Sequence, residues 1–383
     1  MLGSADNGVP VLQTPEARRR RLWMPLFVAV LVAGTAVILT FSGRPAAQLL
    51  GSGSTAAQPL VERAAADFRS ALAADNPDRR RQTGTDWVLD GSGIDYEPVG
   101  SLGGIMRLRQ GAVDFAVSDY PLSADALAAD GLAQFPIAAG AIALVHTLNL
   151  PEGRQLRLDG ETVAAIYLGE ITRWDDPRIA AHNPGIALPA HTITPVHRTD
   201  GSGSTNGFTG WLAATSPAWA SGPGGGSAIT WPDAVGRGAE RTGGVLDLVR
   251  ELPGALGYVE HGQATRAGLQ VVSVQNRAGS FRTPAPEGIA AAIAGADWSG
   301  RDSYTRPVAV TTASEAYPIS IAIYALLKHE RGSRARQVLS FLTYVIDEAD
   351  ASASSLGYVA LPDDAATAVK ASWQTTFGYT AAS

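Results

Sequence analysis

One short segment combines a guanidinium group, a carboxylate and a row of hydrogen-bond donors. Residues 198–205 are Arg-Thr-Asp-Gly-Ser-Gly-Ser-Thr, and the pentapeptide Gly-Ser-Gly-Ser-Thr also occurs at 51–55. Backbone N–H groups of glycine-rich turns and helix N-termini converge on anions, and arginine binds tetrahedral oxyanions through paired hydrogen bonds. We therefore predict that the two loops hold one oxyanion, with Asp200 orienting Arg198. Neither loop is a P-loop, because no Gly-Lys-Ser/Thr follows.

A further carboxylate follows a predicted buried strand. Residues 99–104, Val-Gly-Ser-Leu-Gly-Gly, are typical of a strand-to-helix turn, and residues 113–119 predict a buried strand that ends at Asp119. In open α/β sheets, ligands bind beyond the carboxyl ends of strands, where this carboxylate would lie. By itself, Asp119 could equally be a helix N-cap or a turn residue.

Short apolar runs alternate with amphipathic stretches along the chain after residue 48. Helices are predicted at residues 58–74, 103–110, 160–167, 243–251 and 334–347, and strands at 94–99, 113–118, 141–148 and 192–198. This βαβ rhythm predicts an α/β fold with parallel sheets covered by helices. Strand and helix patterns resume directly after the glycine-rich stretch 215–241, so we expect a surface loop there rather than a domain linker.

Composition and charge exclude several classes of protein. The 383 residues are 45% hydrophobic and 17% charged, which suits one large or two ordinary globular domains, two being favoured. There is no cysteine, which excludes a disulfide framework, a thiolate zinc site, a catalytic thiol and an acylated lipoprotein cysteine. The net charge is −6, and residues 1–48 contribute +3, so the remainder carries −9. Such an acidic body repels phosphate backbones, and we expect no nucleic-acid partner.

The N-terminal segment predicts a membrane anchor. Four arginines at 18–21 precede an uncharged, largely apolar run at 22–41, which as a helix would span about 30 Å, the thickness of a hydrocarbon core. The charge bias predicts a cytoplasmic tail at 1–21 and an extracytoplasmic body. One alternative is a signal peptide cleaved near residues 45–47, which would leave a soluble periplasmic or secreted protein. The other is a buried helix of a soluble protein.

Taken together, these segments resemble the phosphate-binding subunit of bacterial phosphate ABC transporters. The resemblance is carried in order by residues 51–55, 100–104, 114–122 and 198–204, of which 114–122 fit the signature Asp-Phe-x-x-Ser-Asp-x-Pro-Leu. Shorter matches follow at 158–160, 166–169, 174–177, 252–260 and 317–319. The similar region extends from Leu49 to Trp373.

The resemblance implies a site for inorganic phosphate. Carried over position by position, it implies phosphate contacts from Thr55, the N–H of Ala56, Ser101, Asp119, Arg198, Ser202, Gly203 and Ser204, with Asp200 orienting Arg198. It implies no catalytic residue, cofactor or metal. Ala56 stands where the family usually has an aromatic residue, and Leu102 where it has a small polar one, and both changes could loosen the pocket. Ser204 replaces a threonine but keeps the hydroxyl.

The fold implied is a two-lobe α/β periplasmic-binding-protein fold of the class II type, in which the chain crosses twice between the lobes. Lobe one would comprise residues 49–146 and 322–383, and lobe two residues 147–321, with the ligand in the cleft between them. The function implied is high-affinity extracytoplasmic binding of phosphate and its delivery to the permease subunits of an ABC transporter.

Two other functions remain open from the sequence alone. A membrane-anchored phosphate sensor or scaffold would need the same fold and the same site. A serine-type hydrolase could be assembled from the many serines and from His146, His197 or His261. The chain has no G-x-S-x-G elbow and no H-E-x-x-H pair. We therefore predict a binding protein and not an enzyme.

Overall fold

The computed structural model describes residues 49–75, 93–151, 153–232, 236–298, 304 and 312–381. The predicted cytoplasmic tail at 1–21 and the predicted anchor at 22–41 lie outside these residues. Within them, no helix has both the length and the apolar character needed to cross a membrane.

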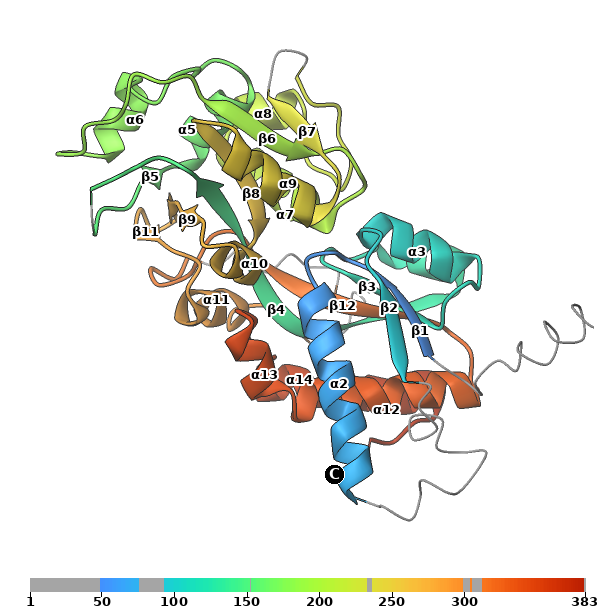
Figure 1. Cartoon of the computed structure of the whole chain (residues 1–383). Coiled ribbons are helices and arrows are strands. Elements are labelled where there is room, and N and C mark those ends of the chain that lie inside the picture. Colours follow the sequence, from blue (N-terminus) through green and yellow to red (C-terminus); the bar gives the residue numbers. More distant parts are fainter. Residues whose placement is uncertain are drawn as a thin grey trace, which may run out of the picture. The chain divides into compact units, whose positions relative to one another are not determined.

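A mixed sheet of nine strands lies at the centre of the described part of the chain (Figure 1). Its strand order is β2-β1-β3-β12-β4-β8-β6-β7, and β9 pairs with β4. The strands are β1 (Leu49–Gly53), β2 (Ile94–Glu97), β3 (Phe115–Ser118), β4 (Leu132–His146), β6 (Thr194–Arg198), β7 (Arg237–Ala239), β8 (Ala255–Glu260), β9 (Gln270–Val271) and β12 (Ser320–Lys328). A second sheet has the order β11 (Phe281–Arg282), β10 (Ser273–Gln275) and β5 (Arg157–Leu158).

The expectation of parallel sheets is only partly correct. β1 is parallel to β2 and β3, and β6 is parallel to β7 and β8. However, β12 is antiparallel to β3 and β4, and β4 is antiparallel to β8 and β9. The alternation of strands and helices indicates local crossovers, but it does not indicate in which direction a strand from a distant part of the chain enters the sheet.

Strand β4 changes its partner partway along its length. Residues 132–141 pair with β12, whereas residues 142–146 pair with β8. Every residue of β4 except Ala133 is buried, so the strand passes continuously through the core. We call β2, β1, β3, β12 and residues 132–141 the first half of the sheet, and residues 142–146, β8, β6 and β7 the second half. In Figure 1, β4 runs in green from the first half into the second.

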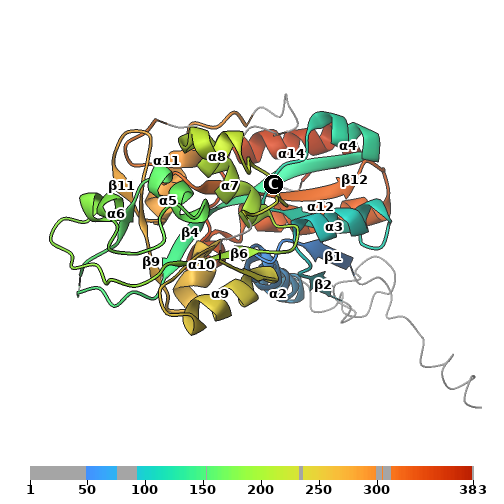
Figure 2. The same cartoon turned by 90° about the horizontal axis from the view of Figure 1, so that it is seen from above.

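Helices cover each half separately. They are α2 (Gln58–Asp75), α3 (Ser101–Arg109), α4 (Ala124–Asp130), α5 (Gly160–Tyr167), α6 (Pro177–His182), α7 (Gly203–Thr215), α8 (Pro217–Ser221), α9 (Arg241–Glu251), α10 (His261–Arg266), α11 (Pro286–Ile293), α12 (Ser333–Asp347), α13 (Asp350–Ser355) and α14 (Asp363–Phe377). In the first half, α3 packs on β1 and β3, and α12 on β1 and β12. In the second, α9 packs on β6 and β8. Figure 2 shows α3 and α12 beside β12, and α9 beside β6.

The five predicted helices are confirmed as α2, α3, α5, α9 and α12. The stretch 215–241 is not simply a loop, because it contains α8 and β7. Helix α8 begins with Pro217 directly after Ser216, whose side chain accepts a hydrogen bond from the N–H of Trp219. A serine N-cap followed by proline is a strong local start signal, which the surrounding glycines obscured.

Candidate functional site

The loop after β1 is folded around Ser54. The N–H of Ser54 donates to the carbonyl of Val117 at 2.8 Å, and its Oγ accepts from the N–H of Ala56 at 3.1 Å. At Gly53, φ is +143° and a Cβ atom would lie 2.0 Å from the Val117 carbonyl oxygen, so only glycine fits. Thr55 and Ala56 are both buried just before α2. The N–H of Ala56, a predicted ligand group, is thus engaged within its own loop.

Asp119 and Ser101 are hydrogen-bonded to each other where β3 ends and α3 begins. The Oγ of Ser101 donates to Oδ1 of Asp119, and the Asp119 N–H lies 3.4 Å from the same Oγ. Asp119 directly follows β3 and is only 4% exposed. The residue before α3, Gly100, has a φ of +88°, and its N–H donates to the carbonyl of Gly53 at 2.9 Å. The loops after β1 and before α3 are therefore in contact.

Arg198 ends β6 and forms a two-point ion pair with Asp200. Its Nε and Nη2 donate to the two carboxylate oxygens at 2.6 and 2.5 Å, and Asp200 also accepts from the N–H of Arg241 at 3.0 Å. The side chain of Arg198 is 2% exposed. Burial would raise the pKa of Asp200, but the hydrogen bonds from Arg198 and Arg241 outweigh it and hold that pKa below its ordinary value. Asp200 is therefore ionised and fixes the plane of the guanidinium.

Tyr258 and Trp231 bind the backbone of Arg198, and no motif in the sequence marks either residue as part of the site. The hydroxyl of Tyr258 accepts from the Arg198 N–H at 3.1 Å and is 2.7 Å from Oγ1 of Thr205, while the Trp231 indole donates to the Arg198 carbonyl at 3.2 Å. Burial raises the pKa of Tyr258 to about 12. The only sequence signal for Tyr258 is its place in the similar segment 252–260.

The N-terminus of α7 lies against the carboxylate of Asp119. Ser202 is the N-cap and accepts from the Thr205 N–H at 3.3 Å, and the Oγ of Ser204 donates to Oδ2 of Asp119 at 3.1 Å. A Cβ atom on Gly203 would lie 1.8 Å from Oδ1 of Asp119, so a side chain there would collide with the carboxylate. The free N–H groups and the positive end of the helix dipole thus face a negative charge.

Three further hydrogen bonds join the loop after β1 to helices α9 and α10, which pack on strands of the second half of the sheet. Oγ1 of Thr55 is 2.9 Å from Oγ1 of Thr242 on α9. The side-chain amide of Gln263 on α10 donates to the carbonyls of Thr55 and Ala56, at 2.7 and 3.2 Å. Tyr358 also donates to the Ala56 carbonyl, but from the segment after β12. Thr242, Gln263 and Tyr358 carry no local sequence signal.

The predicted site residues therefore meet in one place. Thr55 follows β1, Asp119 follows β3 and Arg198 ends β6, so all three lie at the carboxyl ends of strands, as expected for ligand sites in open α/β sheets. The segment 198–204 also lies against the turn before α3, because a Cβ on Gly100 would be 2.7 Å from the Gly201 carbonyl oxygen. The arrangement offers hydroxyls, helical N–H groups, one guanidinium and one carboxylate acceptor.

Neither departure from the family pattern leaves a gap in this structure. Ala56 is fully packed, and its carbonyl is held by Gln263 and Tyr358. Leu102 packs against the segment that carries Arg198, since a Cβ on Gly201 would lie 2.7 Å from the Leu102 Cβ. Leu102 thus contacts the loop between β6 and α7, whereas a small polar side chain at this position would extend less far toward that loop.

The histidines do not form a catalytic arrangement in the described part of the chain. No histidine ring is hydrogen-bonded to a serine there, since Nδ1 of His146 accepts from the Leu148 N–H and His197 stacks on Trp231 at 4.6 Å. Burial lowers the pKa of His146 to about 4 and also lowers those of His197 and His261. The described residues also contain no group of three potential metal ligands.

Known proteins are similar to this chain in sequence and in fold. Residues 40–349 match the family model of the PBP superfamily domain. The phosphate-binding protein PstS of Xylella fastidiosa strain 9a5c is 33% identical over 333 residues, which cover 86% of each chain. The chain belongs to the PBP superfamily and to its PstS family. The PstS protein of Haemophilus influenzae is 34% identical over 289 residues, which cover 74% of this chain and 85% of that protein.

Solved structures support the fold of this PstS family member. The phosphate binding protein of Stenotrophomonas maltophilia superposes with a TM-score of 0.60 at 18% identity, covering 85% of this chain and 94% of that chain. At this identity the likeness concerns the fold alone. The resemblance seen in the sequence, and the periplasmic-binding-protein-like α/β fold that it implied, are confirmed.

Proposed function

We propose that the chain binds inorganic phosphate where Asp119, Arg198 and the N-terminus of α7 meet, and that it delivers phosphate to an ABC permease. The observation that carries this proposal is the position of Asp119 between Ser101 and Ser204, beside a buried arginine already oriented by Asp200. Relatives that are a third identical over most of the chain are named for phosphate binding. The chain acts as a binding protein and not as an enzyme.

The donors suit a phosphate oxyanion. Arg198 uses Nε and Nη2 for Asp200, and its Nη1 has no hydrogen-bond partner among the described residues, so that edge faces the ligand. Gly203 and Ser204 present the first N–H groups of α7, and the hydroxyls of Thr55 and Ser101 add donors. The N–H of Ser202, a predicted ligand, donates instead to the carbonyl of Ser227 at 2.8 Å. On binding, phosphate oxygens accept from the Thr55 and Ser101 hydroxyls in place of Thr242 and Asp119.

The carboxylate of Asp119 gives the site its selectivity. Monobasic and dibasic phosphate carry a P–OH group that can donate a hydrogen bond to a buried carboxylate. Sulfate is fully deprotonated near neutral pH and has no such donor. Sulfate would therefore face an unpaired negative charge in a buried site. A site built around one such hydrogen bond can discriminate strongly between otherwise similar ligands.

The two halves of the sheet correspond to two lobes, with residues 49–146 and 322–383 in lobe one and residues 147–321 in lobe two. At the boundaries the pairing differs from these bounds, because residues 142–146 pair with the second half and residues 320–321 with the first. The support for two crossovers is the change of partner along β4 between residues 141 and 142, and the pairing of β12 with the first half from Ser320 onward. The bonds Ser204–Asp119, Thr55–Thr242 and Gln263–Thr55 would then join the lobes and break when they separate.

The body lies on the extracytoplasmic face of the cell membrane, held by residues 22–41, with residues 1–21 in the cytoplasm. The support is the arginine block followed by the apolar run. Cleavage near residues 45–47 would instead release a soluble periplasmic or secreted protein. An anchored sensor or scaffold would use the same site, and copurification with permease subunits distinguishes transport from it.

The test is calorimetric titration of the full-length chain in detergent with phosphate and with sulfate. Phosphate is expected to bind with one site per chain, and sulfate much more weakly. Heat of binding for sulfate but not for phosphate would overturn the proposal, as would no binding of either anion by folded protein. The variant Arg250→Ala, an exposed arginine on α9, serves as the matched control for arginine substitutions in the site.

A further inference from the structure

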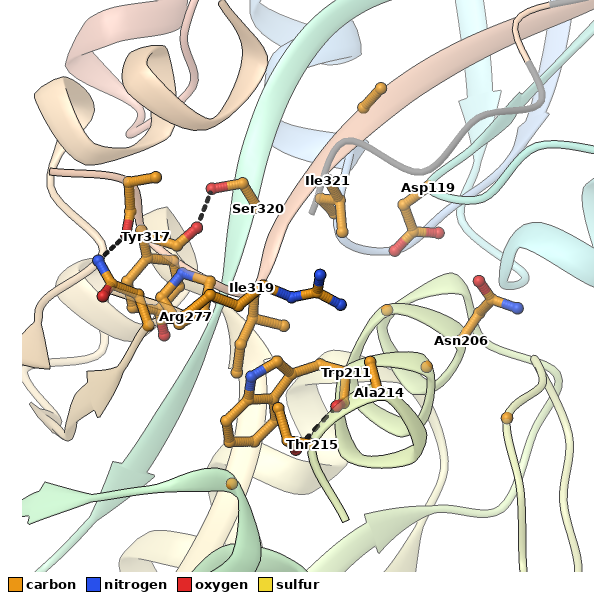
Figure 3. A pocket seen from close by; sticks show the side chains of 18 of the residues that line it. Asp119, Asn206, Trp211, Ala214, Thr215, Arg277, Tyr317, Ile319, Ser320 and Ile321 are labelled. Atoms are coloured by element: carbon orange, nitrogen blue, oxygen red, sulfur yellow. Dashed lines mark hydrogen bonds between the residues drawn. The ribbon is translucent and has the colours of Figure 1, made fainter. Parts of the chain in front are cut away.

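A cavity lies beside the proposed phosphate site and shares Asp119 with it. Its volume is about 620 Å³, within the range of small-molecule pockets. The described residues that line it come from α7, from the start of α5 (159–161), from residues 225–226, 275–277 and 316–324, and from Asp119 and Pro121 (Figure 3). Of the other predicted phosphate ligands, none lines this cavity. The inference drawn from it goes beyond the proposed function and does not depend on it.

Helix α7 leaves this space open because small residues recur on one of its faces. Gly207, Gly210 and Ala214 all line the cavity, at spacings of three and four residues that place them on the same side of a helix. A Cβ atom at Gly210 would have no atom within 4 Å, so this position looks onto empty space. A larger residue at 210 would grow into the cavity without displacing the backbone.

One wall of the cavity is buried and largely apolar. Trp211, Tyr317, Ile319 and Ile321 line it, and each is at least nine-tenths buried. Tyr317 is fixed further because its hydroxyl donates to the Ile142 carbonyl at 2.9 Å. Such a wall accommodates an aromatic or branched aliphatic group.

One guanidinium group points into the cavity. Arg277 follows β10, is exposed, and has no hydrogen-bond or ion-pair partner among the described residues. Figure 3 shows its guanidinium extending over Ile319 toward the interior. Two of the acids along the lining are already engaged, Asp119 by Ser101 and Ser204 and Asp159 by Thr162 and His182. The third, Glu161, is exposed at the start of α5.

We propose that this cavity is a second ligand site, which takes a small organic anion with an aromatic or branched aliphatic body. The apolar wall takes the body of the ligand, and Arg277 pairs with its carboxylate or sulfonate through charge-assisted hydrogen bonds. The preference for an anion follows from the free guanidinium beside the apolar wall, and the body size follows from the cavity volume.

The probe is 4-fluorobenzoate, followed by ¹⁹F NMR titration of the full-length chain in detergent, with empty micelles as the blank. Saturable binding is expected, and the uncharged isostere 4-fluorobenzamide is expected to bind about tenfold more weakly or worse, because it cannot form the charged pair with Arg277. Equal affinity for the acid and the amide, or no saturable binding of 4-fluorobenzoate, would overturn the proposal.

Two substitutions test the location. Arg277→Gln is expected to weaken the binding of 4-fluorobenzoate by about tenfold. Gly210→Leu is expected to abolish this binding because the leucine side chain fills the cavity. The matched controls are Arg250→Gln and Gly243→Leu, the latter another helical glycine whose Cβ would meet nothing within 4 Å. Because Arg277 is exposed, Arg277→Gln is expected to fold even if Gly210→Leu does not. Unchanged probe affinity in Arg277→Gln would rule this site out.

Phosphate titrations of the same variants separate the two proposals. Arg277→Gln is expected to keep the phosphate affinity of the natural chain, and Arg198→Ala is expected to keep the affinity for 4-fluorobenzoate. Loss of probe binding in Arg198→Ala would place the probe in the phosphate site and overturn the second site. If phosphate fails to bind the natural chain while the probe behaves as expected, the phosphate proposal fails and the second site stands.

Discussion

Ser204 donates a hydrogen bond of 3.1 Å to Oδ2 of Asp119, and this bond links the second half of the sheet to the first. Oδ1 of the same carboxylate accepts from Ser101. The two hydroxyls thus stabilise, by hydrogen bonding, a carboxylate that is buried between the N-termini of α3 and α7. A ligand that carries its own hydroxyl donor can take the place of these serines, and one without a donor cannot.

The variant Asp119→Asn is expected to lower the ratio of phosphate to sulfate affinity. The substitution replaces one acceptor oxygen with an amide donor and removes the negative charge that repels sulfate, so sulfate should gain affinity even if phosphate loses some. Calorimetric titration of both anions into both proteins measures the ratio. Equal ratios would mean that Asp119 does not determine selectivity.

The variant Arg198→Ala is expected to weaken phosphate binding by roughly 2–5 kcal/mol, the usual cost of truncating one partner of a buried charged pair. The control Arg250→Ala should bind as the natural chain does. Circular dichroism is needed alongside the titration, because the substitution also leaves Asp200 without its partner. A folded Arg198→Ala protein with unchanged phosphate affinity would remove Arg198 from the site.

The variant Gln263→Ala is expected to weaken phosphate binding by about thirtyfold, because it removes two neutral hydrogen bonds that are worth about 1 kcal/mol each. The amide of Gln263 touches no predicted ligand side chain but holds the carbonyls of Thr55 and Ala56. The loss should therefore appear mainly as faster phosphate release in stopped-flow experiments. Gln374→Ala, on the exposed face of α14, is the control, and identical release rates in all three proteins would contradict a role for Gln263 in closure.

The stability of the protein is expected to fall between pH 6.5 and pH 4 because of His146. Burial lowers the pKa of His146 to about 4 in the folded protein, against 6.5 for a histidine in water, and its Nε2 has no hydrogen-bond partner among the described residues. The unfolded chain therefore takes up a proton in this window and the folded chain does not. The contribution of His146 to the free energy of unfolding is fully present above pH 6.5. It is lost as the pH falls toward 4, by up to about 3 kcal/mol.

Urea denaturation at pH 7 and pH 5 checks this expectation. In His146→Asn, the side-chain oxygen can accept the Leu148 N–H in place of Nδ1, and no ionisable group remains. This variant should lose less stability between the two pH values than the natural chain. The same pH dependence in both proteins would assign the acid sensitivity to other groups.

Protease added outside cells that lack an outer-membrane barrier is expected to degrade the body and to spare residues 1–21. The reason is the block of arginines before the apolar run at 22–41, which favours a cytoplasmic N-terminus. Immunoblotting of an N-terminal tag measures the protected fragment. A mature chain that begins near residue 46 would show cleavage instead of anchoring.

The sequence by itself was sufficient to predict the local features of the site. Each of these features consists of neighbouring residues: glycine-rich turns, helix starts that carry hydroxyl groups, and an arginine two residues before an aspartate. Their conformations depend mainly on residues close by in the sequence. Gly203 illustrates this, since it both begins α7 and leaves room for the Asp119 carboxylate. The five predicted helices were confirmed for the same reason, because helical periodicity and capping are local.

Tertiary structure alone decided which distant residues complete the site. Thr55 meets Thr242 across 187 positions and Gln263 across 208, and no local pattern marks either partner. The antiparallel entry of β12 beside β3 and β4 was missed because a strand buried on both faces gives a continuous apolar run without direction. Direction and pairing are set by burial summed over the whole core, whereas a loop's ability to hold an anion is set by the few residues that form it.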